Sequence, residues 1–434
     1  MHRCRRRFIQ SGLALVTSGA GAWNLNRHSA MAQTTLTNSL DTLLQAAVTN
    51  RDLPGVVALI TDSNHTLYEG AFGERAFGQS TTAKTEPKQN SNMTIDSVMW
   101  IASMTKPIVA AAAMQLVEAG KLGLDAPVST WLPQLGQVKV LTGFDSHGQP
   151  ILRDQTTAMT LRHLLTHTAG FTYDLWDGNL AKYHQVTGKP RSASGKKLGL
   201  ELPLAFDPGT QWEYGINYDW IGLLIEAVSK KTLGEYIRQH ITEPLSMVNT
   251  GFKIETDMRK RLAKIHQRDG EQKFKVTSIE IGAHAEFESG GAGLYSTARD
   301  YAAFMRMILN KGSVNGHQIL KPETVALMTK SSTGDLRIKK LQSQNQAWSR
   351  DIDFFPGLKK SWGLGFMINE EPASTGRSAG SLAWAGIGNT FFWVDPEKNI
   401  AGLMMTQLLP FLDQRVTGVF NDFEHNAYKT LRQK

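Results

Sequence analysis

The chain has 434 residues, 41% of them hydrophobic and 20% charged, which is an ordinary globular balance and enough for a sizeable core. Its formal net charge is +8, but the first 32 residues hold five arginines and no acidic residue, so residues 33–434 carry 42 basic and 39 acidic side chains. That balance of +3 gives no electrostatic basis for binding nucleic acid. After residue 32, no run of 18 apolar residues predicts a membrane-spanning helix, so stable membrane insertion is not expected.

The first 32 residues predict an export signal. An arginine cluster at 5–7 precedes an apolar, small-residue stretch at 11–23, and Ala30-Met31-Ala32 supplies a cleavage site before Gln33. The paired arginines resemble a twin-arginine signal, which carries folded proteins, with a Sec signal as the alternative. We therefore expect a periplasmic or secreted protein. Cleavage would remove Cys4, the single cysteine, and leave a mature chain without disulfides or thiol chemistry.

The predicted elements place strands at both ends of the chain and helices in the middle. In chain order we expect a helix at 38–49, strands at 56–61 and 66–72, a loop at 74–92, mostly helices from 106 to 243 with clear segments at 161–165 and 220–229, a helix at 298–310, strands at 363–368, 390–394 and 400–407, and a helix at 418–432. This order predicts an α+β fold. An antiparallel sheet from the N- and C-terminal segments is flanked by helices, and a mostly helical region at roughly 107–290 is inserted into one domain at 33–434.

Ser103 and Lys106 form the most informative pair. They lie three residues apart at the start of an apolar helical run at 108–117, so their side chains share one helix face. A lysine whose pKa is lowered by burial can take the proton of a serine, and unpaired N–H groups at a helix start can bind an oxyanion. Pro107 disfavours helical backbone at Lys106, so we expect a tight or irregular first turn. A second Ser-x-x-Lys match at 194–197 lies in a polar loop and is interpreted as surface.

Two further segments carry candidate chemistry. The turn Asp207-Pro208-Gly209-Thr210 leads to Tyr214, whose phenol can act as a general base or acid beside a cation. Near the C-terminus, Trp384-Ala385-Gly386-Ile387-Gly388 opens a predicted strand, where a backbone N–H can complete an oxyanion hole. Each segment alone is weak, because such a tyrosine more often packs in the core and such a glycine more often turns the chain.

Four motifs in order carry a family resemblance. They are Ile101-Ala102-Ser103-Met104-Thr105-Lys106-Pro107, Gly120-Lys121-Leu122-Gly123-Leu124-Asp125-Ala126-Pro127-Val128, Leu161-Arg162-His163-Leu164-Leu165-Thr166-His167-Thr168-Ala169-Gly170 and Gly290-Gly291-Ala292-Gly293-Leu294-Tyr295-Ser296-Thr297. From about residue 40 to 430 the chain resembles the class C β-lactamase-related serine hydrolases, which implies the β-lactamase/penicillin-binding-protein fold. The resemblance implies Ser103 as the acylated nucleophile, Lys106 as its proton partner, and Tyr214 as the base for Ser103 and later for water. It also implies an oxyanion hole from the N–H groups of Ser103 and Ile387.

Two departures from the lactamase pattern favour an ester substrate. Lactamases carry Tyr-x-Asn, but here Ile216 stands two residues after Tyr214, and Asn217, one further on, is the remaining candidate amide. Trp384-Ala385-Gly386 stands where lactamases have Lys-Thr-Gly, whose lysine pairs with the lactam carboxylate. An unmet hydrogen bond or charge costs on the order of 1–3 kcal/mol, so anionic lactams should bind poorly. The Trp-x-Gly pattern and the segment 213–220 resemble the carboxylesterase branch, the family VIII esterases.

Other candidate residues are interpreted as structural or left open. Ser378 stands in a G-x-S-x-G sequence, but its flanks do not predict the strand and helix which that nucleophile motif needs. His163 and His167 are expected to position the loop that follows them, and His284 is either packed or pocket-facing. The segment 171–206 is interpreted as a wall or lid of the acyl pocket, with a surface excursion as the alternative. No spacing predicts a metal site, and no cofactor is expected.

The sequence therefore predicts an exported serine hydrolase that cleaves small-molecule carboxylic esters, with short acyl chains, through an acyl-enzyme on Ser103. A β-lactamase, D-amino-acid peptidase or amidase of the same fold is one alternative. An acyltransferase is another, because an acyl-enzyme does not dictate what attacks it. A non-catalytic envelope-binding module is the alternative from a different class. The natural substrate and the oligomeric state stay open.

Overall fold

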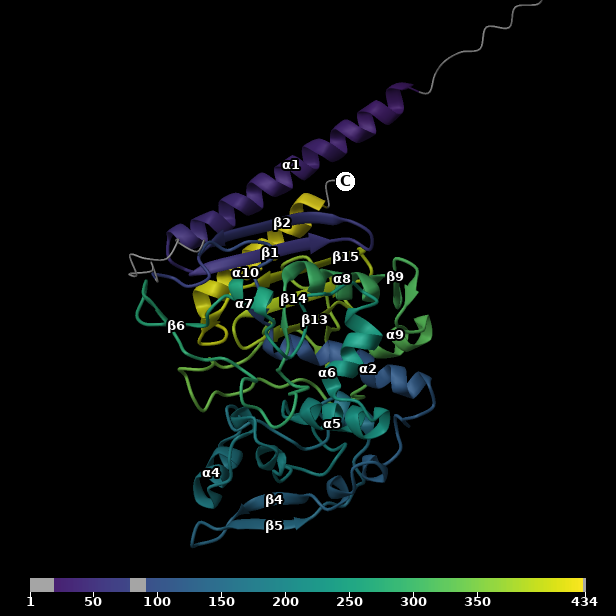
Figure 1. Ribbon diagram of the computed structural model, residues 1–434, viewed down its shortest axis with the longest axis vertical. Helices are drawn as coiled ribbons and strands as arrows, with labels where there is room; N and C mark the ends of the chain where they lie inside the picture. The colour runs from purple at the N-terminus through teal and green to yellow at the C-terminus, as the bar shows by residue number, and fades with distance from the viewer. Residues whose placement is uncertain (1–18, 79–90, 432–434) are drawn as a thin grey trace, which may run out of the picture.

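The computed structural model of the protein describes residues 19–78 and 91–431, with side chains described from Gln33 onward (Figure 1). Residues 1–18 of the predicted export signal therefore lie outside the described residues. Helix α1, Gly19–Thr49, is longer than the predicted 38–49 and runs through the predicted cleavage point. Its buried side chains Leu36, Leu40 and Leu44 recur every fourth residue, which is the stripe of a helix packed on one face.

Seven of the described strands form one large antiparallel sheet in the order β11-β12-β13-β14-β15-β1-β2. Their bounds are Gly55–Thr61 for β1, Thr66–Gly73 for β2, Lys360–Trp362 for β11, Met367–Asn369 for β12, Leu382–Gly386 for β13, Thr390–Asp395 for β14 and Ile400–Met405 for β15. The N- and C-terminal parts of the chain meet inside this sheet, because β1 pairs with β15 in the register Val57 to Met405. This is the predicted α+β arrangement.

Helices cover both faces of the sheet. They are α1 and α10 (Gln414–Leu431) on one face, and α2 (Thr105–Glu118) and α8 (Ala298–Leu309) on the other. Neighbouring residues of β14 show the two faces, since side chains alternate along a strand. Trp393 contacts Phe420 of α10, whereas Phe392 contacts Tyr301 of α8. The hydroxyl of Tyr301 donates to the carbonyl of Met104, which ties α8 to the start of α2.

The predicted strand at 363–368 is wrong, because the chain reverses there. The N–H of Gly363 donates to the carbonyl of Phe366, closing a turn between β11 and β12. Gly365 has a φ of +116°, which lies in the region that favours glycine. A Cβ on Gly363 would lie 2.3 Å from the carbonyl oxygen of Met328, so this position also needs glycine for close approach.

The inserted region is less helical than predicted (Figure 1). It holds α3 (Leu161–Leu165), α4 (Gly178–Thr187), α5 (Asn217–Ser229), α6 (Leu233–Ile237), a π-helix (Arg238–Thr242) and α7 (Thr256–Lys260), with β4 (Lys139–Phe144), β5 (Pro150–Asp154), β6 (His266–Arg268) and β7 (Phe274–Val276). The β4–β5 hairpin, at the end of the molecule opposite α1, contradicts the helix prediction for this stretch. Its turn forms because the carboxylate of Asp145 accepts from the N–H groups of His147 and Gln149.

Short elements complete the fold. They are β3 (Met99–Trp100), β8 (Tyr295–Ser296), β9 (Ser313–Val314), β10 (His317–Gln318), α9 (Pro322–Met328) and β16 (Leu408–Leu409). The β3–β8 pair matters for the site, because Trp100 pairs with Tyr295 and the N–H of Ile101 donates to the carbonyl of Leu294. These bonds fix the chain just before Ser103.

Removal of residues 1–32 should leave the folded domain intact, because the described part of α1 buries side chains from Leu36 onward. We expect the melting temperature, followed by far-UV circular dichroism, to change by less than about 2 °C. Leu40→Ala in the same truncated chain is the positive control and should cost about 2–5 kcal/mol. A loss on truncation as large as that of the Leu40 variant would contradict the prediction.

Candidate active site

Ser103 lies in a single tight turn at the start of α2. Residues Ala102–Met104 form a 3-10 helix, and the α-helix begins at Thr105. This confirms the irregular first turn predicted from Pro107. The N–H groups of a first helical turn have no partner within the helix, so the N–H of Ser103 is placed to bind an anion. Ser103 itself is half-buried, whereas its neighbours Ala102 and Met104 have no exposed surface.

Lys106 lies one helical turn after Ser103, and its side chain extends to the serine hydroxyl. Its Nζ lies 3.1 Å from Ser103 Oγ, 2.8 Å from the carbonyl oxygen of Gly291 and 3.4 Å from the hydroxyl of Tyr173. The side chain has no exposed surface. Burial lowers the pKa of Lys106 to about 7, and the nearby charge of Asp219 acts in the opposite direction. A large share of the lysine is therefore neutral near neutral pH and able to accept a proton.

Tyr214 contacts Ser103 from the opposite side. Its hydroxyl donates to Ser103 Oγ at 2.7 Å and accepts from the indole N–H of Trp384 at 3.0 Å. The ammonium of Lys106 lies 4.7 Å from the centre of the Tyr214 ring. Burial raises the pKa of Tyr214, while the hydrogen bonds with Ser103 and Trp384 lower it. The three residues predicted as catalytic are thus brought together around one oxygen atom.

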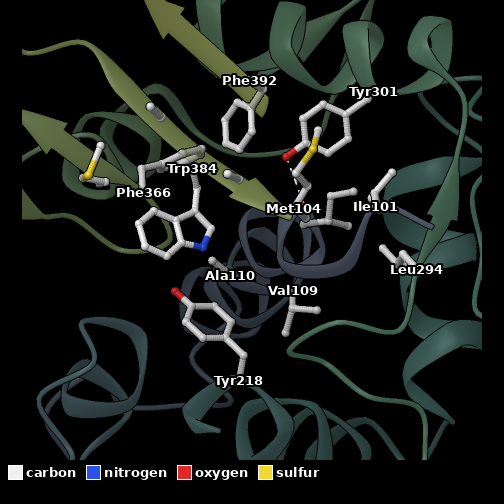
Figure 2. Packing of buried hydrophobic residues seen from close by; sticks show 14 of the residues in the cluster. Ile101, Met104, Val109, Ala110, Tyr218, Leu294, Tyr301, Phe366, Trp384 and Phe392 are labelled. Atoms are coloured by element: carbon white, nitrogen blue, oxygen red, sulfur yellow. Dashed lines mark hydrogen bonds between the residues drawn. The ribbon is translucent and has the colours of Figure 1, made fainter. Parts of the chain in front are cut away.

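Trp384 closes the site from strand β13. Figure 2 shows its indole pointing from the strand toward α2 and Tyr218. Its ring centre lies 4.9 Å from that of Tyr214 and 4.6 Å from that of Trp362. The side chain of Trp384 therefore presents a neutral N–H donor to the phenol oxygen of Tyr214.

The other predicted residues of β13 differ in what they offer. Gly386 must be glycine, since a Cβ there would lie 2.3 Å from the carbonyl oxygen of Ile101 in the nucleophile turn. Ile387 follows directly, in the hairpin between β13 and β14. Ala385 pairs with Phe391, which stacks on Phe420 of α10, so its side chain faces away from Ser103. Only the backbone of Ala385 can therefore take part in the site.

Asn217 turns away from the nucleophile. Its side-chain amide is buried and lies 2.8 Å from Nδ1 of His167. The geometry therefore does not support the predicted contact of Asn217 with substrate. His167, predicted as structural, packs its ring 4.7 Å from that of Tyr214, and burial keeps its pKa well below the ordinary value. A neutral imidazole thus packs against the ring of Tyr214.

Asp219 is a site residue that the sequence reasoning missed. Its buried carboxylate accepts from Ser289 Oγ at 2.6 Å and from the N–H of Gly291 at 3.1 Å. The carbonyl of that same Gly291 accepts from Lys106 Nζ. Burial raises the pKa of Asp219, and the two hydrogen bonds and Lys106 lower it. Two sequence signals lay close to this arrangement, the glycine pair at 290–291 and the segment 213–220, but neither singled out the carboxylate of Asp219.

The segment 171–206 supplies a wall of the site at its beginning. The rings of Tyr173 and Trp176 lie 5.4 and 5.7 Å from that of Tyr214, and Tyr173 also meets Lys106. These contacts support the predicted wall of the acyl pocket. The rest of the segment, including α4, lies farther along the inserted region (Figure 1).

The alternative candidates lie elsewhere. Ser378 is buried between β12 and β13, where its N–H donates to Asp395, without the strand-to-helix turn of a nucleophile elbow. The second Ser-x-x-Lys match at 194–197 and the side chain of His284 are exposed. Within residues 33–78 and 91–431, His, Cys, Asp and Glu side chains form no cluster able to hold a metal. In the part of the chain that the structure describes, no helix is both long and apolar enough to cross a membrane.

Comparison with known proteins agrees with this geometry. A family model described as Beta-lactamase matches residues 40–426, so the chain belongs to this family. The chain is 31% identical over 406 residues to the monacolin J acid methylbutanoyltransferase of Aspergillus terreus, covering 91% of this chain and 96% of that protein. It is 30% identical over 409 residues to the lovastatin esterase of Penicillium rubens, covering 90% and 98%.

Among solved structures, the unliganded simvastatin synthase of Aspergillus terreus has a TM-score of 0.77 at 29% identity, over 92% of this chain and 99% of that chain. The predicted family, the α+β fold and the prediction of an enzyme of the serine-hydrolase type are confirmed.

The pKa of Lys106 predicts a pH dependence for Ser103. Neutral Lys106 predominates above a pH of about 7, so modification of Ser103 by a fluorophosphonate should accelerate as pH rises through this value and be lost as pH falls. In Asp219→Asn the negative charge that raises the lysine pKa is gone, and the midpoint should move to lower pH. Stopped labelling reactions between pH 5.5 and 9, read by mass spectrometry, measure both. A rate independent of pH over this range would exclude Lys106 as the proton acceptor.

Proposed function

We propose that the protein is a serine esterase that works through an acyl-enzyme on Ser103. The observation that carries the proposal is that Ser103 Oγ touches both Lys106 Nζ and the Tyr214 hydroxyl, at 3.1 and 2.7 Å. A serine becomes a nucleophile when a neighbouring group accepts its proton. Here one neighbour is a lysine whose pKa is lowered to about 7 by burial.

The proposed reaction has two halves. Ser103 Oγ attacks the ester carbonyl while its proton passes to the Tyr214–Lys106 pair, and the N–H groups of Ser103 and Ile387 hold the oxyanion. The pair then returns the proton to the departing alcohol, leaving an ester on Ser103. In the second half the same pair takes a proton from the incoming water, whose oxygen attacks the acyl-enzyme. The pair then passes that proton to Ser103 Oγ as its bond to the acyl group breaks, which releases the acid and restores the serine. Trp384 supports Tyr214 whenever negative charge develops on its oxygen, because its N–H is already directed there.

The substrate class follows from what surrounds the nucleophile. Trp384 offers a neutral ring where lactamases offer a cation, and Asn217 is occupied with His167. Ile216, which takes the place of the lactamase amide, is buried and apolar. A lactam carboxylate would find no charge at these positions, whereas a neutral ester needs none. Tyr173 and Trp176 at the wall favour a short acyl chain bound against aromatic rings.

Acyl transfer is the second candidate. Similarity to a methylbutanoyltransferase and to an esterase along nearly the whole chain supports both outcomes of one acyl-enzyme. The two differ in what attacks the acyl group: an alcohol in the transferase and water in the esterase. Adding a primary alcohol during turnover and measuring the new ester against the free acid separates them.

We also propose that the protein is exported and that its signal is cleaved. The sequence pattern of residues 1–32 supports a cleaved signal, and a site that needs no thiol suits an oxidising compartment. N-terminal sequencing of the protein recovered outside the cytoplasm would then begin at Gln33.

Ser103→Ala should abolish hydrolysis of p-nitrophenyl butyrate, with kcat falling by at least about 10³-fold, because no other group can form the acyl-enzyme. Ser378→Ala is the matched control and should keep wild-type activity, since its buried hydroxyl lies away from Lys106 and Tyr214. A chromogenic cephalosporin should be turned over poorly by the wild type. If Ser103→Ala remains active while Ser378→Ala is inactive, the proposed nucleophile is wrong.

Trp384→Phe should lower kcat for the same ester by about 10- to 100-fold with little change in KM, because a hydrogen bond to a charged phenol oxygen is worth about 1.5–3 kcal/mol. Trp362→Phe is the control. Trp362 packs in the same aromatic cluster, but its N–H donates to the carbonyl of Leu165 and not to Tyr214. Equal losses in both variants would assign the effect to packing.

A further inference from the structure

A large chamber lies next to the candidate active site but outside it. Its volume is about 1470 Å³, and it lies between β12–β14, helix α10 and the segment 346–358. Neither Ser103, Lys106 nor Tyr214 lines it. Small-molecule sites usually enclose about 300–1,000 Å³, so this chamber can hold a ligand much larger than a short acyl group.

Part of the chamber lining is aromatic and apolar. Its lining includes Phe354, Met367, Trp384, Phe391, Pro410 and Phe420. Phe391 and Phe420 are stacked with ring centres 4.5 Å apart, and Phe354 packs against Trp384 at 5.6 Å. A flat or ring-containing apolar body is the partner that such faces bind best.

The charges around the chamber single out one arginine. Most lining ions are already paired, as Arg268–Asp413, Arg377–Glu424, Arg415–Asp52, Arg415–Glu271, Asp351–Lys340 and Asp353–Lys360. Arg350 differs, because among the described residues the hydrogen bond of its guanidinium goes to the neutral Oε1 of Gln346, at 3.2 Å. A guanidinium without a carboxylate at the rim of an apolar chamber is suited to an anionic head group.

We propose that this chamber is a second binding site, which takes an amphipathic anion: an aromatic or ring-containing body against Phe391 and Phe354, with a carboxylate or sulfonate on Arg350. Trp384 makes the site relevant to catalysis. It lines the chamber and also donates its N–H to the hydroxyl of Tyr214. One residue therefore both lines the chamber and contacts the tyrosine beside Ser103.

Two fluorescent probes test the proposal. Anilinonaphthalene sulfonate has the ring body and the anion, and N-phenylnaphthylamine has the same body without the charge. Both should bind the mature wild-type protein saturably. Arg350→Gln should weaken the sulfonate about fivefold and leave the neutral probe unchanged. Arg337→Gln, an exposed arginine that does not line the chamber, is the matched control and should change neither.

A filling variant tests the location. Thr417→Trp places an indole into the chamber from the half-buried face of α10 and should weaken both probes, with the circular dichroism of the variant unchanged. Labelling Ser103 with a fluorophosphonate should leave both affinities as they were. Absence of saturable binding, or equal sulfonate affinity in wild type and Arg350→Gln, would overturn the proposal. So would loss of binding on labelling, which would place the probes in the active site. The labelling control needs a reactive Ser103, but the binding measurements and the Arg350 and Thr417 variants do not, so the proposal fails or stands apart from the proposed function.

Discussion

The burial of one lysine ammonium is the constraint around which the site is organised. Lys106 has no exposed surface, and removing a charge from water costs several kcal/mol unless other groups compensate for it. No carboxylate lies within ion-pair distance of Lys106 in the described part of the chain. The compensation comes from three oxygens, on Ser103, Tyr173 and Gly291. Because the compensation is incomplete, burial lowers the pKa of Lys106 to about 7, and the proposed activation of Ser103 depends on this property.

Asp219, through its charge, limits how far burial lowers the pKa of Lys106. It holds the backbone of Gly291, whose carbonyl meets Lys106, so its charge acts on the lysine from one residue away. A carboxylate in direct contact with Lys106 would hold the lysine protonated. A carboxylate farther away than Asp219 could not accept the hydrogen bond from the N–H of Gly291 and so would not fix the backbone there. The aromatic rings of Tyr173, Tyr214 and Trp384 exclude water from the same volume, and His167 supports them as a neutral ring. The low polarity of the site is therefore a product of its packing.

Local spacing was enough to predict part of this arrangement. Ser103 and Lys106 lie on one turn, so their contact follows from helix geometry alone, and the turn before Tyr214 marked a third candidate. The contacts of Asp219 and Tyr173 with the lysine environment join distant segments, and no local pattern encodes them. For the same reason the direction of Asn217 could not be derived, because it depends on His167, which lies in the turn after α3. In the fold, β1, β14 and β15 were predictable as short apolar runs between turns, and they are buried throughout. The turn at Gly363 and Gly365 and the hairpin at Asp145 overrode the continuous elements expected there.

The pairing of β1 with β15 has a consequence for how the protein is made. Val57 of β1 pairs with Met405 of β15, the second and third strands counted from the β2 edge of the sheet. β1 therefore stays without one of its neighbours until almost all of the chain has left the ribosome. Contacts between residues so far apart in sequence form late and slowly. During that interval β1, an apolar strand with no exposed residue in the finished fold, offers its backbone to any other strand nearby. The earliest strand of the large sheet therefore depends for its second partner on one of the last strands to be synthesised.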